Sequence, residues 1–386
     1  MAFASHLARG ADLRAAVAEA CAAVKGVLPE PNILFPFLRA ADPNDYRRLP
    51  ELLAEHFPGV PLFGCGAAGV IADGHEEEDG PALALSAAKL PGTITLSYLD
   101  PDAILVEGQL VAERIAAEVK GTGDLLIVVD PFTLSPDALL VALDEAIPGA
   151  NKLGALSSAG PVTRSSMLYG RTAHRRGALV LRLGEEVRLR PIVAQGCRPV
   201  GRPHVITRVD DQAIIELDGK PALDALQALF KQLDAVDREI FRHSLFVGIE
   251  MDKSTVEVRT DRLLVRNLLG VNPAKGSIGV ATTLKVYDVM HFVLRDSKSA
   301  ELELATLLAA AKADGAAPFG ALLFTCLGRG RHLFGSVDHD PEMFKGTFGP
   351  LPIGGFFANG EIAPVGGRTF LHGYTSAFAM FELVRG

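Results

Sequence analysis

The same short pattern occurs three times in the chain: an apolar strand, a glycine, four or five small or apolar residues, and a second glycine. The three copies are PLFGCGAAGVI at 61–71, NKLGALSSAGPV at 151–162 and LPIGGFFANGEI at 351–362. Each follows segments with the periodicity of a helix, a strand and a second helix, and strand candidates come after it. The pattern therefore predicts a repeated unit of helix, strand, helix, strand, glycine turn and hairpin.

This unit predicts an α/β protein. A strand–helix–strand connection favours a parallel pair with a right-handed crossover, and hairpins at 81–99 and 177–194 would add antiparallel strands. We expect mixed sheets covered by helices. The third copy lies about twice as far from the second as the second lies from the first. That spacing predicts a degenerate fourth copy, with a helix at 221–233 and a strand at 244–250.

The length of 386 residues predicts two domains, at roughly 100–200 residues each. Residues 195–223 contain Gly196, Pro199, Gly201 and Pro203, which break regular structure and indicate a junction. Two pairs of units on either side of it suggest two related lobes. We therefore expect domains at residues 1–200 and 201–386.

Charge and composition argue against several classes of protein. The net charge is −8, and no basic stripe interleaved with aromatic residues is present, which argues against nucleic acid as a partner. No apolar run approaches the roughly 20 residues of a membrane span, and the N-terminus lacks the apolar segment of a signal peptide. The cysteines are scattered without a C-x-x-C pair, which fits a reducing, cytoplasmic location: Cys21, Cys65, Cys197 and Cys326.

The third copy of the repeat carries the chemistry that suggests a binding site. Glycines there would let backbone approach a ligand. An arginine in this stretch could grip a ligand carboxylate, whereas a carboxylate and an amide could meet an amino group. The predicted ligand-binding residues are Cys326, Arg329, Arg331, Asn359, Glu361, His372 and Tyr374. The alternative for Arg329 is an ion pair with Asp338, Asp340 or Glu361, and the alternative for Cys326 is packing.

Other motifs carry less. Residues 64–69 match the letters G-x-G-x-x-G, but a loop and a strand follow them, so the helix N-terminus of a dinucleotide site is missing. The acidic run at 75–79 is interpreted as a solvated loop. His332, Asp338, His339 and Asp340 lack a metal-binding spacing, and no metal is predicted. His291 is interpreted as a core histidine, with haem ligation as the alternative.

The C-terminal motifs resemble a known family. The segment from Cys326 to Gly330, the stretch 351–366 and the sequence LHGYT at 371–375 are similar to the C-terminal part of FIST domains. QGCRPVG and ELDGKPAL resemble that family's junction between its N and C parts. The resemblance extends from about residue 30 to 380. It implies a FIST N-type domain at 1–200 and a FIST C-type domain at 201–386.

The resemblance also implies a sensory or signal-transduction role. FIST domains have been proposed to bind small ligands such as amino acids, and some are linked to haem. They often accompany signalling output domains, for which this chain leaves no room, so we expect a sensor that acts through a separate signalling protein. The family supplies no catalytic residues to transfer, which favours a binding protein over an enzyme. The alternatives are a cysteine-dependent enzyme that uses Cys326 and a haem-binding gas sensor.

Overall fold

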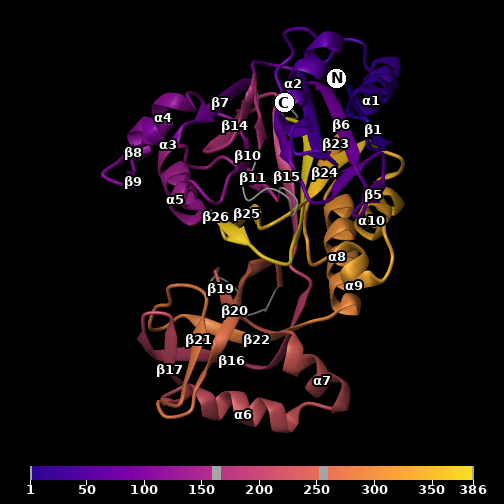
Figure 1. The fold of residues 1–386 in the computed structure, drawn as a ribbon. Helices are drawn as coiled ribbons and strands as arrows, with labels where there is room; N and C mark the ends of the chain where they lie inside the picture. Colours follow the sequence, from indigo (N-terminus) through magenta and orange to yellow (C-terminus); the bar gives the residue numbers. More distant parts are fainter. Residues whose placement is uncertain (1, 159–166, 252–259, 385–386) are drawn as a thin grey trace. The chain divides into compact units, whose positions relative to one another are not determined.

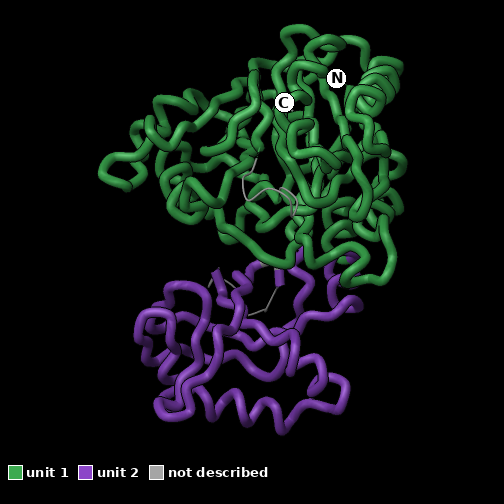
Figure 2. The backbone as a smooth tube through the Cα atoms, viewed as in Figure 1, with its two compact units in different colours: residues 1–193, 306–386 green, residues 194–305 purple. Residues whose placement is uncertain are grey.

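The computed structural model describes residues 2–158, 167–251 and 260–384. The chain forms two compact units, which Figure 2 distinguishes by colour. Unit 1 consists of residues 1–193 and 306–386, and unit 2 of residues 194–305. Unit 1 is therefore assembled from two separate stretches of the chain. The predicted α/β class, with mixed sheets and helices over them, is confirmed (Figure 1).

The first repeat of unit 1 begins near the N-terminus. The carboxylate of Asp12 caps its first helix by accepting hydrogen bonds from the backbone N–H groups of Arg14 and Ala15. That helix buries Leu13, Val17 and other residues of its periodic face. The elements of this repeat are β1 (Ala2–Arg9), α1 (Leu13–Val27), β2 (Ile33–Arg39), α2 (Asp45–His56), β3 (Gly64–Gly66), β4 (Val70–Ala72), β5 (His75–Glu77), β6 (Ala82–Lys89) and β7 (Thr95–Leu99).

The second and third repeats follow the same order. The second contains α3 (Pro101–Ile104), β8 (Leu105–Val106), β9 (Gln109–Leu110), α4 (Ala112–Glu118), β10 (Leu125–Val129), α5 (Pro136–Ala146), β11 (Lys152–Leu156), β12 (Leu168–Tyr169), β13 (Ala173–His174), β14 (Ala178–Arg182) and β15 (Val187–Ala194). The third contains α8 (Ser297–Ala313), β23 (Gly320–Cys326), α9 (Gly330–Phe334), α10 (His339–Phe348), β24 (Ile353–Ala358), β25 (Glu361–Val365), β26 (Arg368–His372) and β27 (Ser376–Leu383).

Three six-stranded sheets of equivalent order result. Their orders are β1-β6-β2-β3-β12-β13, β7-β14-β10-β11-β25-β26 and β15-β27-β23-β24-β4-β5. Each has a parallel pair, β2–β3, β10–β11 or β23–β24, and an antiparallel neighbour on the other side of that pair's first strand, β6, β14 or β27. Residues from all three sheets, including Phe37, Leu126 and Phe356, share one buried core. The three sheets therefore share one strand order, and they pack against one another around a common hydrophobic core.

The repeats exchange hairpins. The strands after each glycine turn leave their own repeat: β4–β5 completes the third sheet, β12–β13 the first, and β25–β26 the second. The predicted hairpins at 81–99 and 177–194 are wrong, although their strands exist. β6 and β7 lie in different sheets, as do β14 and β15, because the chain crosses to a neighbouring sheet at these points.

Glycine is required at one equivalent position in each repeat. A Cβ at Gly64 would lie 1.9 Å from the carbonyl oxygen of Pro36, and one at Gly154 would lie 1.8 Å from that of Ile127. At Gly355 the distance to the carbonyl oxygen of Leu323 would be 1.9 Å. No side chain fits such a gap. The glycines of the repeated pattern therefore allow close packing of the parallel strands.

Unit 2 has a different construction. Its elements are β16 (Cys197–Asp210), β17 (Ala213–Leu217), β18 (Lys220–Pro221), α6 (Ala222–Gln232), α7 (Ala235–His243), β19 (Leu245–Glu250), η1 (Thr260–Arg262), β20 (Leu263–Asn272), β21 (Ser277–Val280) and β22 (Val289–Arg295). The sheet order is β16-β22-β19-β20-β21-β17-β18, and β16 also pairs with β17.

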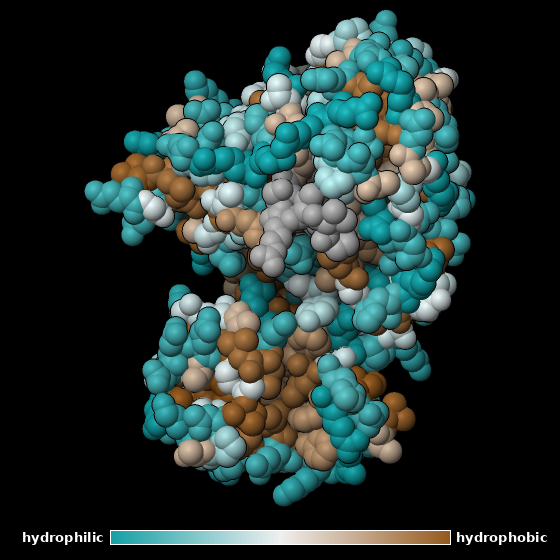
Figure 3. Space-filling model, in the orientation of Figure 1, coloured by the Kyte–Doolittle hydropathy of each residue, from teal (hydrophilic) through white to brown (hydrophobic). Residues whose placement is uncertain are grey.

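The predicted fourth copy of the repeat is wrong. The strand pairs of unit 2 within the described ranges are antiparallel, so the parallel pair that defines a repeat is missing there. The predicted helix and strand exist as α6 and β19, and α6 packs Leu226 and Leu229 onto the core of this unit. Hydrophobic residues gather on the face of unit 2 turned to the viewer in Figure 3.

Candidate functional site

The three glycine turns meet and hydrogen-bond to one another. The hydroxyl of Ser158 donates to the carbonyl of Phe357 and accepts from the N–H of Ala68 at 3.1 Å. The N–H of Phe357 donates to the carbonyl of Gly69 at 2.9 Å. These contacts join the first, second and third repeats at one place. This place lies at the carboxyl ends of the parallel strands, where open α/β sheets commonly bind ligands.

Cys326 lies at the carboxyl end of β23. It is half-buried, whereas the other three cysteines are buried. Its thiol accepts a hydrogen bond from the N–H of Gly328 at 3.5 Å, and its own N–H donates to the carbonyl of Thr375 at 3.0 Å. Burial raises the pKa of Cys21 to about 12 and that of Cys65 well above its ordinary value. Cys326 is therefore the cysteine best exposed to a ligand or reagent.

Glu361 and His372 lie directly opposite each other on the paired strands β25 and β26. Both are buried, with Glu361 0% exposed. The carboxylate of Glu361 accepts a hydrogen bond from the N–H of Thr375 at 3.1 Å, and Nε2 of His372 donates to the carbonyl of Ala363 at 3.1 Å. The buried carboxylate of Glu361 therefore supports the backbone of Thr375, whose carbonyl in turn holds the N–H of Cys326, while His372 supports β25.

Tyr374 and Asn359 are the last two predicted residues near the carboxyl end of β23. Tyr374 has a φ of +62°, a left-handed conformation that is strained for a bulky side chain. Its ring lies near Gly328, since a Cβ added there would be 3.5 Å from Cδ1 of Tyr374. Asn359 follows β24 and is exposed, and its N–H donates to the carbonyl of Leu156 at 3.4 Å. The strained tyrosine is the kind of feature that concentrates at functional sites.

Arg329 is held in a buried ion pair, which is one of the alternatives weighed for it. Its guanidinium donates from Nε and Nη2 to the two carboxylate oxygens of Asp340, both at 2.9 Å. Arg329 is 0% exposed and Asp340 is 2% exposed. Burial alone would raise the pKa of Asp340, but Arg329 and His339 hold it well below its ordinary value. Thr325 also donates to this carboxylate at 3.2 Å.

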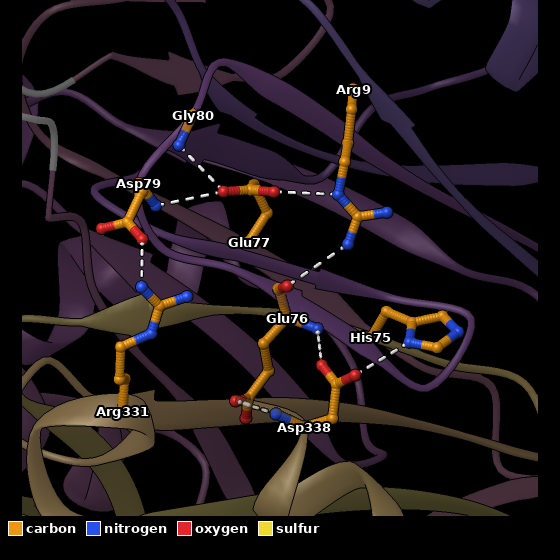
Figure 4. A network of polar contacts seen from close by, with 8 residues as sticks. All are labelled: Arg9, His75, Glu76, Glu77, Asp79, Gly80, Arg331 and Asp338. Atoms are coloured by element: carbon orange, nitrogen blue, oxygen red, sulfur yellow. Dashed lines mark hydrogen bonds and ion pairs between the residues drawn. The ribbon is translucent and has the colours of Figure 1, made fainter. Parts of the chain in front are cut away.

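Arg331 extends toward Asp79, which follows the hairpin of the first repeat (Figure 4). Its guanidinium donates to Asp79 at 2.6 Å, and its backbone N–H donates to Glu78 at 2.9 Å. The interpretation of 75–79 as a solvated loop is wrong, because residues 75–77 form β5 and Glu76 is only 3% exposed. An inserted strand thus brings this acidic run against the third repeat.

Glu76 and Asp338 are bound to each other reciprocally (Figure 4). The N–H of Glu76 donates to Oδ1 of Asp338 at 2.6 Å, and the N–H of Asp338 donates to Oε2 of Glu76 at 2.7 Å. His75 also contacts Asp338, at 2.9 Å. Burial, with a smaller contribution from the nearby Asp340 charge, raises the pKa of Glu76 to about 8. This contact therefore contains a proton-sensitive carboxyl group.

The structure thus places five of the predicted residues around the carboxyl end of β23 and engages the side chains of the other two in ion pairs. The five are Cys326, Asn359, Glu361, His372 and Tyr374; we call them the β23 edge. Arg329 and Arg331 form ion pairs with Asp340 and Asp79 instead. The sequence did not predict the burial of Glu76 against Asp338. A run of acidic residues does not indicate which of them will be buried when the segment pairs as a strand with another repeat.

The described residues contain no group of three side chains arranged to hold a metal ion. Nε2 of His291, the haem alternative, is 2.7 Å from a carboxylate oxygen of Glu250. Within the same described ranges, no helix is long and apolar enough to cross a membrane.

Comparison with known families decides where this architecture belongs. Residues 33–220 match the FIST N domain, and residues 222–364 match the FIST C domain. The chain belongs to the FIST family. The FIST N match covers the first repeat from β2 onward, the second repeat and the first strands of unit 2, whereas the FIST C match covers the rest of unit 2 and most of the third repeat. The family boundary therefore runs through unit 2.

Relatives of this FIST protein occur in mycobacteria. It is 35% identical over 327 residues to an uncharacterised protein of Mycobacterium tuberculosis strain H37Rv, covering 83% of each chain. It is also 35% identical over 326 residues to an uncharacterised protein of Mycobacterium bovis, covering 83% of this chain and 82% of that one. FIST domains are associated with sensory signal transduction, and the chain shares that family association.

Proposed function

We propose that this FIST protein is a cytoplasmic sensor that binds a small metabolite, such as an amino acid, at the β23 edge. The observation that carries the proposal is the meeting of Cys326, Asn359 and Tyr374 above the buried Glu361 and His372. Glu361 and Asn359 would meet an amino or polar group of the ligand. In this proposal Arg331 would meet its acidic group by leaving Asp79, while Arg329 shapes the site through Asp340.

Two features support this reading. Glycine-lined turns from three repeats converge here, so a ligand can contact backbone from each. Tyr374 holds a strained conformation beside Gly328, which suits a side chain positioned for contact. The signal would pass to a separate protein, and the FIST N and FIST C regions, with the predicted division near residue 200, would act together in binding.

A thermal-shift screen tests the proposal. Wild-type protein is heated with each amino acid and with a set of small metabolites, and a ligand that binds the folded state raises the Tm. The variant Glu361→Gln should lose that shift. Asp124→Asn is the matched control, because Asp124 likewise accepts hydrogen bonds from backbone N–H groups, those of Asn151 and Leu189. A shift that persists in Glu361→Gln would contradict the proposed site.

Protection from alkylation gives an independent measurement. Iodoacetamide should modify Cys326 faster than the three buried cysteines, and a ligand found by the screen should slow that modification. Equal labelling of all four cysteines would contradict the proposal that Cys326 contributes to the binding site.

The second candidate is cysteine-dependent catalysis. It is favoured by the half-buried thiol of Cys326 beside the N–H of Gly328, a donor of the kind that stabilises an oxyanion. Iodoacetamide labelling measured against pH separates the two candidates. A thiolate formed below neutral pH would favour catalysis, whereas labelling with the pH profile of an ordinary thiol would favour binding.

A further inference from the structure

Unit 2 contains a pocket that no part of the proposed function uses. Its volume is about 690 Å³, within the usual size range of small-molecule sites. It lies between β16, the turn joining β17 to β18, and helix α6. The lining residues that matter below are apolar (Leu217, Leu229, Phe292) or charged and polar (Arg202, His204, Lys220).

A β-bulge opens this pocket. The register between β16 and β22 shifts between Val200 and His204, so the intervening residues leave the ladder. Gly201 bends the strand with a φ of +73°, and a Cβ there would lie 2.9 Å from Leu229 on α6. Among the α6 residues that line the pocket, Ala225 and Ala228 have small side chains. A bent strand and a helix with small residues leave room between them.

The polar wall of the pocket is fixed in place. The carboxylate of Asp218 accepts hydrogen bonds from Nδ1 of His204 at 2.8 Å and from the N–H of Val205 at 2.9 Å. Arg202 also donates to it at 2.8 Å. His204 is only 8% exposed and meets the ring of Phe292 edge-on. Because its Nδ1 is bound to Asp218, the other ring nitrogen is left for a different partner.

One cation at the mouth of the pocket, Lys220, is placed to meet an anion. The negative charge of Asp218 is offset by Arg202, to which it is paired. Lys220 lines the same pocket, and within the described part of the chain no ion pair engages its ammonium group. Asp224 is exposed in the first turn of α6, where a carboxylate interacts favourably with the helix N-terminus. Its charge opposes an anion and so provides a test.

We propose that this pocket binds a small organic carboxylate with an apolar body. The carboxylate lies toward Lys220 and Arg202, and the apolar body packs on Phe292, Leu217 and Leu229. This second site belongs to unit 2 alone. It does not depend on the β23 edge.

Isothermal titration of the full chain with three probes tests the proposal. Decanoate has the predicted chemistry, decanol has the same chain without a charge, and decyltrimethylammonium reverses the charge. Decanoate should bind at least ten times more tightly than either of the others. Equal binding of decanoate and decanol would overturn the assignment of the charged mouth.

Variants locate the site. Lys220→Gln should weaken decanoate binding about tenfold, Lys220→Arg should restore most of it, and Asp224→Asn should strengthen it. Ala228→Trp, at an exposed helix position that tolerates bulk, should fill the groove and abolish binding. Lys231→Gln is the matched control, since Lys231 lies on α6 but does not line the pocket. Binding that is indifferent to both Lys220→Gln and Ala228→Trp would refute the proposal.

Glu361→Gln separates this site from the proposed sensory site. The variant should bind decanoate like the wild type, because Glu361 belongs to unit 1. A loss of decanoate binding in Glu361→Gln would show that decanoate binds at the β23 edge, and it would overturn the unit 2 site.

Discussion

One position separates the third repeat from the other two. Strand register makes Arg39, Asp130 and Cys326 equivalent, because each lies three residues after the residue whose carbonyl faces the repeated glycine. Arg39 donates to the carbonyls of Ala68 and Asp79. Asp130 accepts from its own loop, from Thr133 at 2.6 Å and from Phe132 at 3.3 Å. Two repeats use this position to hold a loop.

The third repeat uses the same position differently. Cys326 is a weak hydrogen-bonding group and is half-buried, so it contributes little to holding its loop. The loop is held instead by the pair of Arg329 and Asp340 farther along. Because Arg329 and Asp340 hold the loop, the residue at the end of β23 is not needed for that purpose and would be available to contact a ligand in the proposed site. The following changes test this division, from the largest expected effect to the smallest.

Alanine at the equivalent glycines should affect all three repeats alike. Gly355→Ala, Gly154→Ala and Gly64→Ala each place a Cβ within 2 Å of a backbone oxygen, so each should cost more than about 3 kcal/mol or prevent folding. Chemical denaturation followed by circular dichroism measures the cost. Gly346→Ala in α10 is the control, because nothing lies within 4 Å of the added atom. A well-folded Gly355→Ala protein would contradict the shared design.

Breaking the buried ion pair should be the next largest effect. Arg329→Met leaves the Asp340 carboxylate buried without its guanidinium, at a cost of about 3–5 kcal/mol. The double variant Arg329→Met/Asp340→Leu should recover much of that loss, since both charges are gone. Denaturant midpoints of the three proteins provide the measurement. If Arg329→Met were as stable as the wild type, the pair would not be holding the loop.

Glu76 should make stability depend on pH. Its pKa of about 8 in the folded state lies above the ordinary value of 4.5, so the folded protein binds more protons than the unfolded chain between these pH values. Stability should therefore fall as pH rises through that window, by up to about 5 kcal/mol. Glu76→Gln should flatten the dependence.

Glu77 on the same strand is the control for this pH effect. Hydrogen bonds from Gly80, Arg9 and Asp79 outweigh partial burial and lower its pKa. Its contribution is therefore present above pH 4.5 and is lost as pH falls, the opposite direction. Thermal melts of Glu76→Gln and Glu77→Gln from pH 4 to 9 should separate the two groups. A Glu76→Gln protein with the wild-type pH profile would contradict the raised pKa.

The smallest effect should fall at Cys326 itself. Asp130→Ala removes two accepted hydrogen bonds in a buried place and should cost about 2 kcal/mol. Cys326→Ala should cost less than about 1 kcal/mol, because the thiol is half-buried and weakly bonded. Urea unfolding of the two variants compares them directly. Equal costs would mean that Cys326 has the same structural task as Asp130.

The sequence predicts the local features of the fold but not the long-range pairing of its strands. The glycine turns and the helix and strand pattern were predictable, because steric and periodic constraints act within a few residues. The hairpin exchange was not, since nothing in 70–77 states that Ile71 pairs with Gly355. For the same reason the candidate residues Cys326, Glu361 and Tyr374 could be selected from one glycine-rich stretch, whereas the contact of Glu76 with Asp338 could not be predicted.

The exchange of hairpins bears on how the chain folds as it is synthesised. The first sheet lacks its last strands until Tyr169 and residue 174 have been made. The second waits for β25 and β26, which come after the whole of unit 2, and the third cannot form until β27 is complete. Unit 2 has all its strands before then. On the ribosome, the first sheet should form earliest and unit 2 next, whereas the second and third sheets should close last, when the C-terminal strands have been made.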